Sequence, residues 1–228
     1  VAEDGFDLEQ VLERGAHVSF ANCGLPYFVG GEITEERSLL VQTPASLRAA
    51  LALDVRTRSE VTALDTAAKT VSVMTEDGTY ELSYDALVLS PGALALRPPL
   101  PGLDSPRVRT LRTVEDAVAL RDEVLGRARR AVVLGAGFIG IEAAEALARQ
   151  GLAVSVVELA SHPLPPLETE LAWLITQELG ELGVEVRTGI AAASVEHGAD
   201  ADTVVLVDGT RLEADIVVLS VGVRPDTA

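Results

Sequence analysis

A glycine-rich turn between two apolar stretches constrains the fold of this chain more than any other feature. Gly135, Gly137 and Gly140 form the pattern GxGxxG directly after an apolar run at 131–134. The run predicts a buried β-strand, and the small and apolar residues after the turn recur at helical spacing, which predicts a helix ending near residue 150. Another apolar run at 153–158 predicts the next strand. This order of strand, turn, helix and strand is typical of a parallel, Rossmann-like sheet.

The turn also predicts a ligand. Gly135 permits a tight turn, and Gly137 lets a pyrophosphate approach the backbone at the helix N-terminus, where the helix dipole stabilises negative charge. Gly140 lets the helix pack closely on the sheet. Glu158 ends the second strand, and its carboxylate can accept hydrogen bonds from both hydroxyls of an adenine ribose. The same carboxylate would repel a 2′-phosphate, so NADH is favoured over NADPH.

Two alternatives stay open at this point: a glycine turn that binds nothing, and a turn that binds FAD. We predict an NAD(H) site. It comprises Gly135, Gly137, Phe138, Ile139, Gly140 and Glu158.

The two halves of the chain repeat one order of elements. Residues 84–92 and 214–222 each contain an aspartate, an apolar run, a serine and a closing glycine. Each run predicts a strand buried on both faces, and a predicted three-strand β meander precedes each run. Such self-similarity predicts an α/β fold of two Rossmann-like dinucleotide-binding domains, each with a three-strand meander. We place these domains at residues 1–112 and 113–228.

Turn and capping residues predict the remaining elements. Strands are expected at 7–13, 58–65, 70–75, 79–83, 85–90, 184–188, 190–196, 203–207, 210–213 and 215–220. Helices are expected from residue 22 or 23 to 30, and at 44–53, 113–126 and 168–182.

Composition excludes several classes of function. The formal charge is -17, from 35 acidic and 18 basic residues, and such a surface repels a nucleic-acid backbone. A single cysteine cannot form an intramolecular disulfide, so we expect a reducing cytoplasm. No apolar run approaches the roughly 20 residues that span a bilayer, so no membrane partner is expected. The three histidines lack metal-ligand spacing, and no metal site is predicted.

The single cysteine, Cys23, lies where a helix is predicted to begin. A helix N-terminus stabilises a thiolate, which is the form that attacks a disulfide or a peroxide. Ser19 and Asn22 are polar neighbours that could orient the sulfur. The alternative is a buried cysteine that packs as a small hydrophobic residue.

Residues 18–33, VSFANCGLPYFVGGEI, resemble the coenzyme A-disulfide reductases. With NADH oxidases and peroxidases, these belong to the FAD-dependent pyridine nucleotide-disulfide oxidoreductases. The similarity covers essentially the whole chain and continues through 40–44, 87–93, 137–142 and 221–225. It implies that the first domain is of the FAD type and the second of the NAD type. It also implies that Cys23 is the single redox cysteine, which cycles between a thiolate and a mixed disulfide with coenzyme A.

The resemblance implies further roles by position. Ser19 and Asn22 match residues that line the pocket for the coenzyme A thiol. Glu13 matches the acid that holds the FAD ribose. Phe138 resembles the aromatic gate between nicotinamide and flavin, and Glu142 the acid near their contact. The remaining matched cofactor positions are Ser90, Pro91, Gly92 and Gly222. Glu13 and Glu142 could instead be solvated charges, and Phe138 a packing residue.

The sequence departs from the family pattern at both ends. It shows no FAD pyrophosphate fingerprint before Glu13, no later strand with an aspartate for the FAD ribitol, and no C-terminal interface domain. We therefore expect the chain to correspond to the middle of such an enzyme, to bind FAD poorly by itself, and to derive from a homodimeric parent. The parent is expected to pass electrons from NADH through FAD to Cys23 and on to coenzyme A disulfide, a similar low-molecular-weight disulfide or a persulfide.

Three alternatives to this function stay open. The first is an NADH oxidase or peroxidase that uses a sulfenic acid on Cys23. The second is a truncated, non-catalytic NAD(H)-binding module. The third is a flavoprotein electron carrier without thiol chemistry.

Overall fold

A computed structural model describes residues 9–227 and separates the chain into two compact units. Unit 1 contains the residues up to 21 together with 40–90, and unit 2 contains 22–39 together with 91–228. The segment that carries Cys23 therefore belongs to the same unit as the GxGxxG turn. The division into domains at 1–112 and 113–228 stays a prediction, and the compact units differ from it in where residues 22–39 and 91–112 pack.

Unit 2 is built on a five-stranded parallel sheet with the order β12-β11-β10-β16-β9. The strands are β9 (Val108–Arg109), β10 (Arg130–Leu134), β11 (Ala153–Val157), β12 (Glu185–Arg187) and β16 (Ile216–Leu219). The helices are α1 (Leu25–Val29), α3 (Val114–Leu125), α4 (Phe138–Arg149) and α5 (Thr169–Glu181), with 3-10 turns at Asn22–Gly24 and Glu36–Leu39. Unit 2 also contains a three-strand meander of β13 (Ala192–Glu196), β14 (Asp202–Leu206) and β15 (Arg211–Ala214). It is completed by a strand pair of β8 (Ala93–Ala95) and β17 (Val223–Pro225).

The order of the sheet creates one topological switch point. Successive strands β10, β11 and β12 run to one side, and β16 pairs with β10 on the other side. Ligands of open parallel sheets bind at the carboxyl ends of the strands where the order reverses. Here that point lies between the residues that follow Leu134 and those that follow Leu219.

The small and apolar residues predicted on one face of α4 are all buried. Gly140, Ala143, Ala144 and Leu147 form this face, which packs on β10 and β11. Strands β10 and β16 are buried on both faces, as their continuous apolar runs predict for a parallel sheet covered by other elements. The two-faced burial explains why β10 and β16 lack the alternating pattern of a half-exposed strand.

Unit 1 contains smaller sheets. Its strands are β1 (Gln10–Leu12), β2 (Ser19–Phe20), β3 (Leu40–Gln42), β4 (Asp54–Arg56), β5 (Glu60–Asp65), β6 (Thr70–Thr75) and β7 (Gly78–Ser83), and its helix is α2 (Pro44–Leu51). Strands β1 and β4 pair in parallel, β2 and β3 antiparallel, and β5-β6-β7 form the meander. Thr43 and Ser46 form a capping box at the start of α2, in which the side-chain oxygen of each accepts a hydrogen bond from the backbone N–H of the other.

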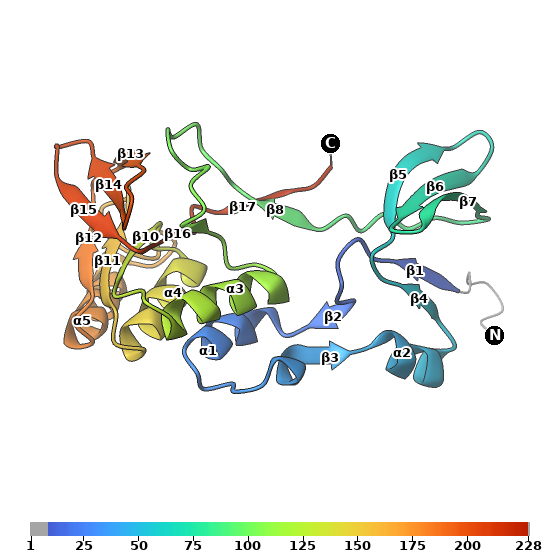
Figure 1. Ribbon diagram of the computed structural model, residues 1–228, viewed down its shortest axis with the longest axis horizontal. Coiled ribbons are helices and arrows are strands. Elements are labelled where there is room, and N and C mark those ends of the chain that lie inside the picture. The colour runs from blue at the N-terminus through green and yellow to red at the C-terminus, as the bar shows by residue number, and fades with distance from the viewer. Residues whose placement is uncertain (1–8, 228) are drawn as a thin grey trace. The chain divides into compact units, whose positions relative to one another are not determined.

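The α/β class is confirmed, and each unit has its predicted three-strand meander (Figure 1). The GxGxxG element, the helix at 114–125 and the helix that begins near Cys23 also lie where the sequence predicts them. The part of the predicted strand 7–13 before residue 9 lies outside the described residues.

The predicted strand at 85–90 is wrong. All six residues are exposed, with 39% of Leu87, 61% of Val88 and 68% of Leu89 accessible, and no described strand pairs with them. A strand that is apolar on both faces is stable only when neighbouring strands satisfy its backbone and cover its side chains. Among the described residues of unit 1, only β1 and β4 pair in parallel, whereas β16, the equivalent run in unit 2, lies between β10 and β9.

No helix in residues 9–227 is long and apolar enough to cross a membrane. The same residues contain no group of three or more His, Cys, Asp or Glu side chains arranged to hold a metal ion.

Candidate functional site

The GxGxxG turn has the backbone geometry that a pyrophosphate needs. Gly135 adopts a φ of +101°, and a Cβ atom there would lie 2.6 Å from the carbonyl oxygen of Ser220. A Cβ on Gly140 would lie 2.0 Å from the carbonyl oxygen of Gly135, so the helix and the turn approach too closely for any side chain. By contrast, nothing lies within 4 Å of a Cβ on Gly137, the N-cap residue of α4. No side chain caps this twelve-residue helix, and the first N–H groups of a helix have no partner within the helix itself.

Glu158 is held beside this turn. The backbone N–H of Ala136 donates a hydrogen bond to Oε2 of Glu158 at 2.6 Å, and the N–H of Ala160 donates to Oε1 at 2.7 Å. Each carboxylate oxygen can accept a second hydrogen bond. The carboxylate is half-buried and therefore keeps acceptor capacity for two ribose hydroxyls next to the turn. The residues present thus fit the adenosine and pyrophosphate parts of a dinucleotide.

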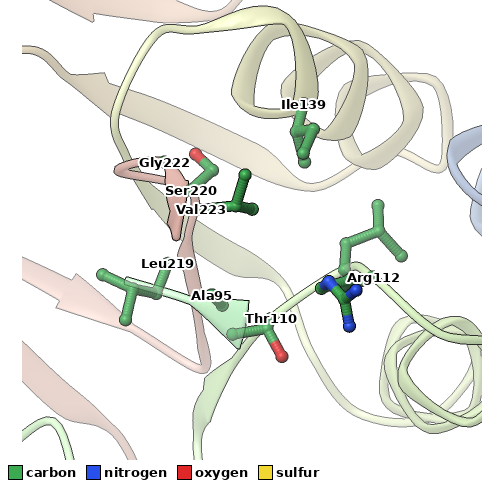
Figure 2. Close-up of a pocket in the computed structure, with 9 residues that line it drawn as sticks. Ala95, Thr110, Arg112, Ile139, Leu219, Ser220, Gly222 and Val223 are labelled. Atoms are coloured by element: carbon green, nitrogen blue, oxygen red, sulfur yellow. The ribbon is translucent and has the colours of Figure 1, made fainter. Parts of the chain in front are cut away.

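A pocket opens at the switch point of the sheet. Its lining residues are Ala95, Thr110, Leu111, Arg112, Ile139, Leu219, Ser220, Gly222 and Val223. Figure 2 shows Ile139 of α4 and Thr110 on opposite sides of the pocket, with Val223 between them. Ile139 and Gly222, both predicted cofactor residues, therefore line one pocket. Phe138, the predicted aromatic gate, is 67% exposed at the start of α4.

Arg112 and Ser220 line this pocket and were not predicted. Ser220 is the residue after β16, and its hydroxyl donates to the carbonyl oxygens of Leu134 and Gly135, which fixes the turn to β16. Arg112 immediately precedes Thr113, the N-cap of α3. A Cβ on Gly92 would lie 3.4 Å from Nη2 of Arg112, so this predicted flavin residue lies beside a pocket cation. The only signal for Ser220 in the sequence is its position at the end of a predicted buried strand.

The thiol segment packs on the helices of unit 2. Cys23 is exposed in the 3-10 turn that leads into α1, and Asn22 is exposed beside it. Leu25, Phe28 and Val29 bury the opposite face of α1, which lies against both α3 and α4 (Figure 1). The interpretation of Cys23 as a buried hydrophobic residue is therefore wrong, because its neighbours in α1 fill that space instead.

An acidic groove lies between α1 and α4. Tyr27, Glu32, Glu142 and Glu145 line it together with Pro26, Ala146 and Arg149. The negative charge of Glu142 is the main cause that raises the pKa of Tyr27, followed by loss of hydration and the charge of Glu32. Glu142, predicted near the flavin–nicotinamide contact, therefore lies beside the phenol of the thiol segment.

The remaining predicted residues lie in different parts of the chain. Glu13 follows β1 in unit 1, and its carboxylate accepts a hydrogen bond from the N–H of Gly15 at 2.5 Å. Ser19 lies in β2 of unit 1, where it pairs with Gln42, and Ser90 is exposed at the end of unit 1. Pro91 and Gly92 begin the next segment of unit 2.

The described residues supply only part of an FAD site. Glu13 is the one predicted ribose ligand, and it adjoins a two-stranded sheet without a glycine-rich turn. Within the described residues, the predicted flavin positions are thus spread over both units, whereas Gly135, Gly140 and Glu158 of the predicted NAD(H) site lie at one turn.

The comparison with family models decides the identity. The model described as pyridine nucleotide-disulphide oxidoreductase matches residues 6–228. The chain belongs to this family. This membership agrees with the glycine turn, with the carboxylate of Glu158 held beside it and with the exposed Cys23.

Several relatives are about one third identical in sequence to this chain. The epsilon subunit of NADH-dependent phenylglyoxylate dehydrogenase from Aromatoleum evansii is 33% identical over 217 residues, which cover 95% of this chain and 50% of that protein. An NADH oxidase from Methanocaldococcus jannaschii is 30% identical, with coverage of 95% and 49%. A coenzyme A disulfide reductase from Staphylococcus haemolyticus is 32% identical, with coverage of 94% and 48%. The chain thus spans about half the length of the curated relatives it matches.

The solved structure of reduced Bacillus anthracis CoADR-RHD superposes with a TM-score of 0.91. Its sequence is 35% identical, and the match covers 96% of this chain and 40% of that chain. The similarity confirms the α/β fold and the expected resemblance to coenzyme A-disulfide reductases.

Proposed function

We propose that this chain carries the NADH-binding and thiol parts of a flavin-dependent NADH:disulfide oxidoreductase. Coenzyme A disulfide, or a similar low-molecular-weight disulfide or persulfide, is the proposed substrate. The observation that carries the proposal is that an exposed thiol and a GxGxxG site with an acidic ribose ligand occur in one compact unit.

In this proposal the residues of unit 2 bind and orient NADH. The N-terminus of α4 and the open backbone at Gly137 bind the pyrophosphate, and Glu158 accepts hydrogen bonds from the adenine ribose. The pocket lined by Ile139, Ser220 and Gly222 lies at the same switch point and accepts the nicotinamide end. Bound flavin supplies the two-electron relay between NADH and a sulfur centre.

Cys23 provides the reacting sulfur. Its thiolate attacks one sulfur of the substrate disulfide, so that one S–S bond breaks, a mixed disulfide forms on Cys23 and one substrate thiolate leaves. Two electrons from NADH then reduce the mixed disulfide and release the second thiol. The sum is NADH, one proton and one disulfide converted to NAD⁺ and two thiols. Asn22, which precedes Cys23 in unit 2, is proposed to orient the substrate at the thiol.

The first test is the absorption spectrum of the purified protein, before and after addition of FAD, followed by titration with NADH. We expect NADH-dependent reduction of coenzyme A disulfide once flavin is bound, and loss of that activity in Cys23→Ser with NADH binding retained. Equal activity in Cys23→Ser would refute the thiol mechanism and favour a flavoprotein electron carrier. NADH binding by a chain that takes up no flavin would favour the non-catalytic module for this chain.

An NADH oxidase or peroxidase is the second candidate function, because two relatives of similar identity carry the name NADH oxidase. In that case Cys23 cycles through a sulfenic acid and reduces an oxygen species instead of a disulfide. Oxygen consumption with NADH in the absence of any disulfide distinguishes this function. A dimeric parent enzyme and a cytoplasmic location stay predictions.

A further inference from the structure

The thiol segment is fastened to unit 2 at the end opposite Cys23. Helix α1 is only five residues long, and too short to be stable by itself. Its last carbonyl groups accept hydrogen bonds from the backbone N–H groups of the residues that follow, Gly30, Gly31 and Ile33. Side chains on α3 and at the end of α4 add hydrogen bonds to the carbonyl groups of Phe28, Gly30 and Ile33. The position of the thiol therefore depends on these side chains as well as on apolar packing.

Arg121 of α3 makes the main connection. Its Nη1 donates hydrogen bonds to the carbonyl oxygens of Phe28 at 3.0 Å and Ile33 at 2.8 Å. Its guanidinium also lies over the ring of Phe28, 4.3 Å from the ring centre. Hydrogen bonds from a charged donor are stronger than neutral ones, and a cation–π contact adds to them. One half-buried side chain thus holds both the end of α1 and the loop that follows it.

Gln150, the C-cap residue of α4, makes the second connection. Its Nε2 donates a hydrogen bond to the carbonyl oxygen of Gly30. A Cβ on Gly30 would lie 3.3 Å from Cβ of Ala146, and Gly31, at a φ of +80°, adjoins the Gln150 amide. The two glycines therefore let the end of α1 approach the helix that carries the GxGxxG turn at its other end.

We propose that Arg121 and Gln150 are positioning residues that fix the position of Cys23 on the dinucleotide-binding unit. Together these two residues are called the segment clamp. The functional part of this proposal rests on the proposed function, since a positioned thiol matters only if Cys23 reacts. Neither residue touches the reacting atoms. Each acts through the backbone of α1.

The test uses the purified chain and its single cysteine. A nitroxide label on the exposed Cys23 reports local mobility by electron paramagnetic resonance, and hydrogen exchange of the amides at 25–33 reports opening of the segment. In Arg121→Gln we expect faster label rotation and amide exchange faster by about tenfold, the effect of losing a hydrogen bond to a charged donor. Arg121→Lys keeps the cation and a nitrogen with three N–H donors, and it is expected to restore much of the wild-type behaviour.

Arg127→Gln is the matched control, because Arg127 is exposed two residues after α3 ends. It should change neither signal. Exchange of the β10 amides and the NADH dissociation constant should stay at wild-type values in Arg121→Gln, whereas general destabilisation would change both. In the flavin-loaded enzyme, the variant should lower kcat for disulfide reduction and leave the KM for NADH unchanged.

Wild-type label mobility and exchange in Arg121→Gln would overturn the proposal, as would equal acceleration at β10. Absence of disulfide reduction in the wild-type protein would refute the proposed function instead. The label and exchange signals would still decide whether the clamp holds the segment, since neither requires turnover.

Discussion

The contact between Gly140 and the glycine turn gives the sharpest stability prediction. In an exposed helix, replacing glycine by alanine stabilises the protein by about 1 kcal/mol. Gly140 lies in the first turn of α4, yet a Cβ there would lie 2.0 Å from the Gly135 carbonyl oxygen and 2.6 Å from Oγ of Ser220. We therefore expect Gly140→Ala to destabilise the protein, opposite to its helix propensity.

The magnitude follows from how far the backbone must move. Contacts of a Cβ atom do not fall below 3.0 Å, so a separation of 2.0 Å requires the turn to retreat by at least 1 Å. The obstructing atom belongs to the backbone, and overpacking of this kind costs about 3 kcal/mol at the upper end. After the gain of about 1 kcal/mol from helix propensity, the free energy of unfolding should fall by about 2 kcal/mol. For a chain of this size that corresponds to a melting temperature lower by about 4–8 °C.

Thermal unfolding followed by circular dichroism and by fluorescence of Trp173, the single tryptophan, measures this loss in unit 2. Gly180→Ala is the matched control, since Gly180 lies in α5 with nothing within 4 Å of a Cβ. It should raise the melting temperature slightly. A Gly140→Ala protein that melts at or above the wild-type temperature and binds NADH with wild-type affinity would refute this account of the turn.

Three further predictions concern ligand binding and pH. Gly137→Ala should leave the melting temperature unchanged but weaken NADH binding in titrations, because its Cβ meets open space that the pyrophosphate is expected to fill. Glu158→Ala should lower the preference for NADH over NADPH by about tenfold, measured as the ratio of dissociation constants, because the charge that repels a 2′-phosphate is removed. Burial opposes ionisation of Asp215, but hydrogen bonds from the side chain of Arg130 and from the backbone of Arg129 and Arg130 prevail and lower its pKa. The stabilisation by Asp215 is therefore complete above its unfolded pKa of about 3.9 and is lost as the pH falls through the lower folded value. Asp215→Asn should be less stable than wild type at pH 7, and the difference in melting temperature should shrink on acidification below about pH 4.

Local signals in the sequence predicted most elements correctly. Thr43 and Thr113 mark the starts of two helices because a side-chain oxygen at the N-cap accepts a bond from a free backbone N–H. The GxGxxG pattern itself is local, and Gly140 is required by its contact with Gly135 five residues earlier, although Gly135 also lies against the distant Ser220. Local signals of this kind can be recognised without knowing how distant parts of the chain fold.

Longer-range features were harder to predict. Residues 85–90 and 215–220 have nearly the same pattern, but only the second run forms a strand, because only it has strands on both sides. Arg112 and Ser220 were missed as pocket residues because their neighbours are distant in sequence. The placement of the Cys23 segment on α3 and α4 was also not predicted, since it depends on Arg121 and Gln150, about 100 residues downstream.

The sequence by itself determined the α/β class, the dinucleotide turn with its acidic partner Glu158, and the chemistry available to the lone thiol. These depend on backbone conformations and residue types within short segments. Only the tertiary structure decided which apolar run becomes a strand, which residues meet at the pocket, and that Cys23 stands on the dinucleotide-binding unit. Those outcomes depend on partners that supply hydrogen bonds and cover apolar surface from far along the chain, and no local pattern encodes where such partners lie.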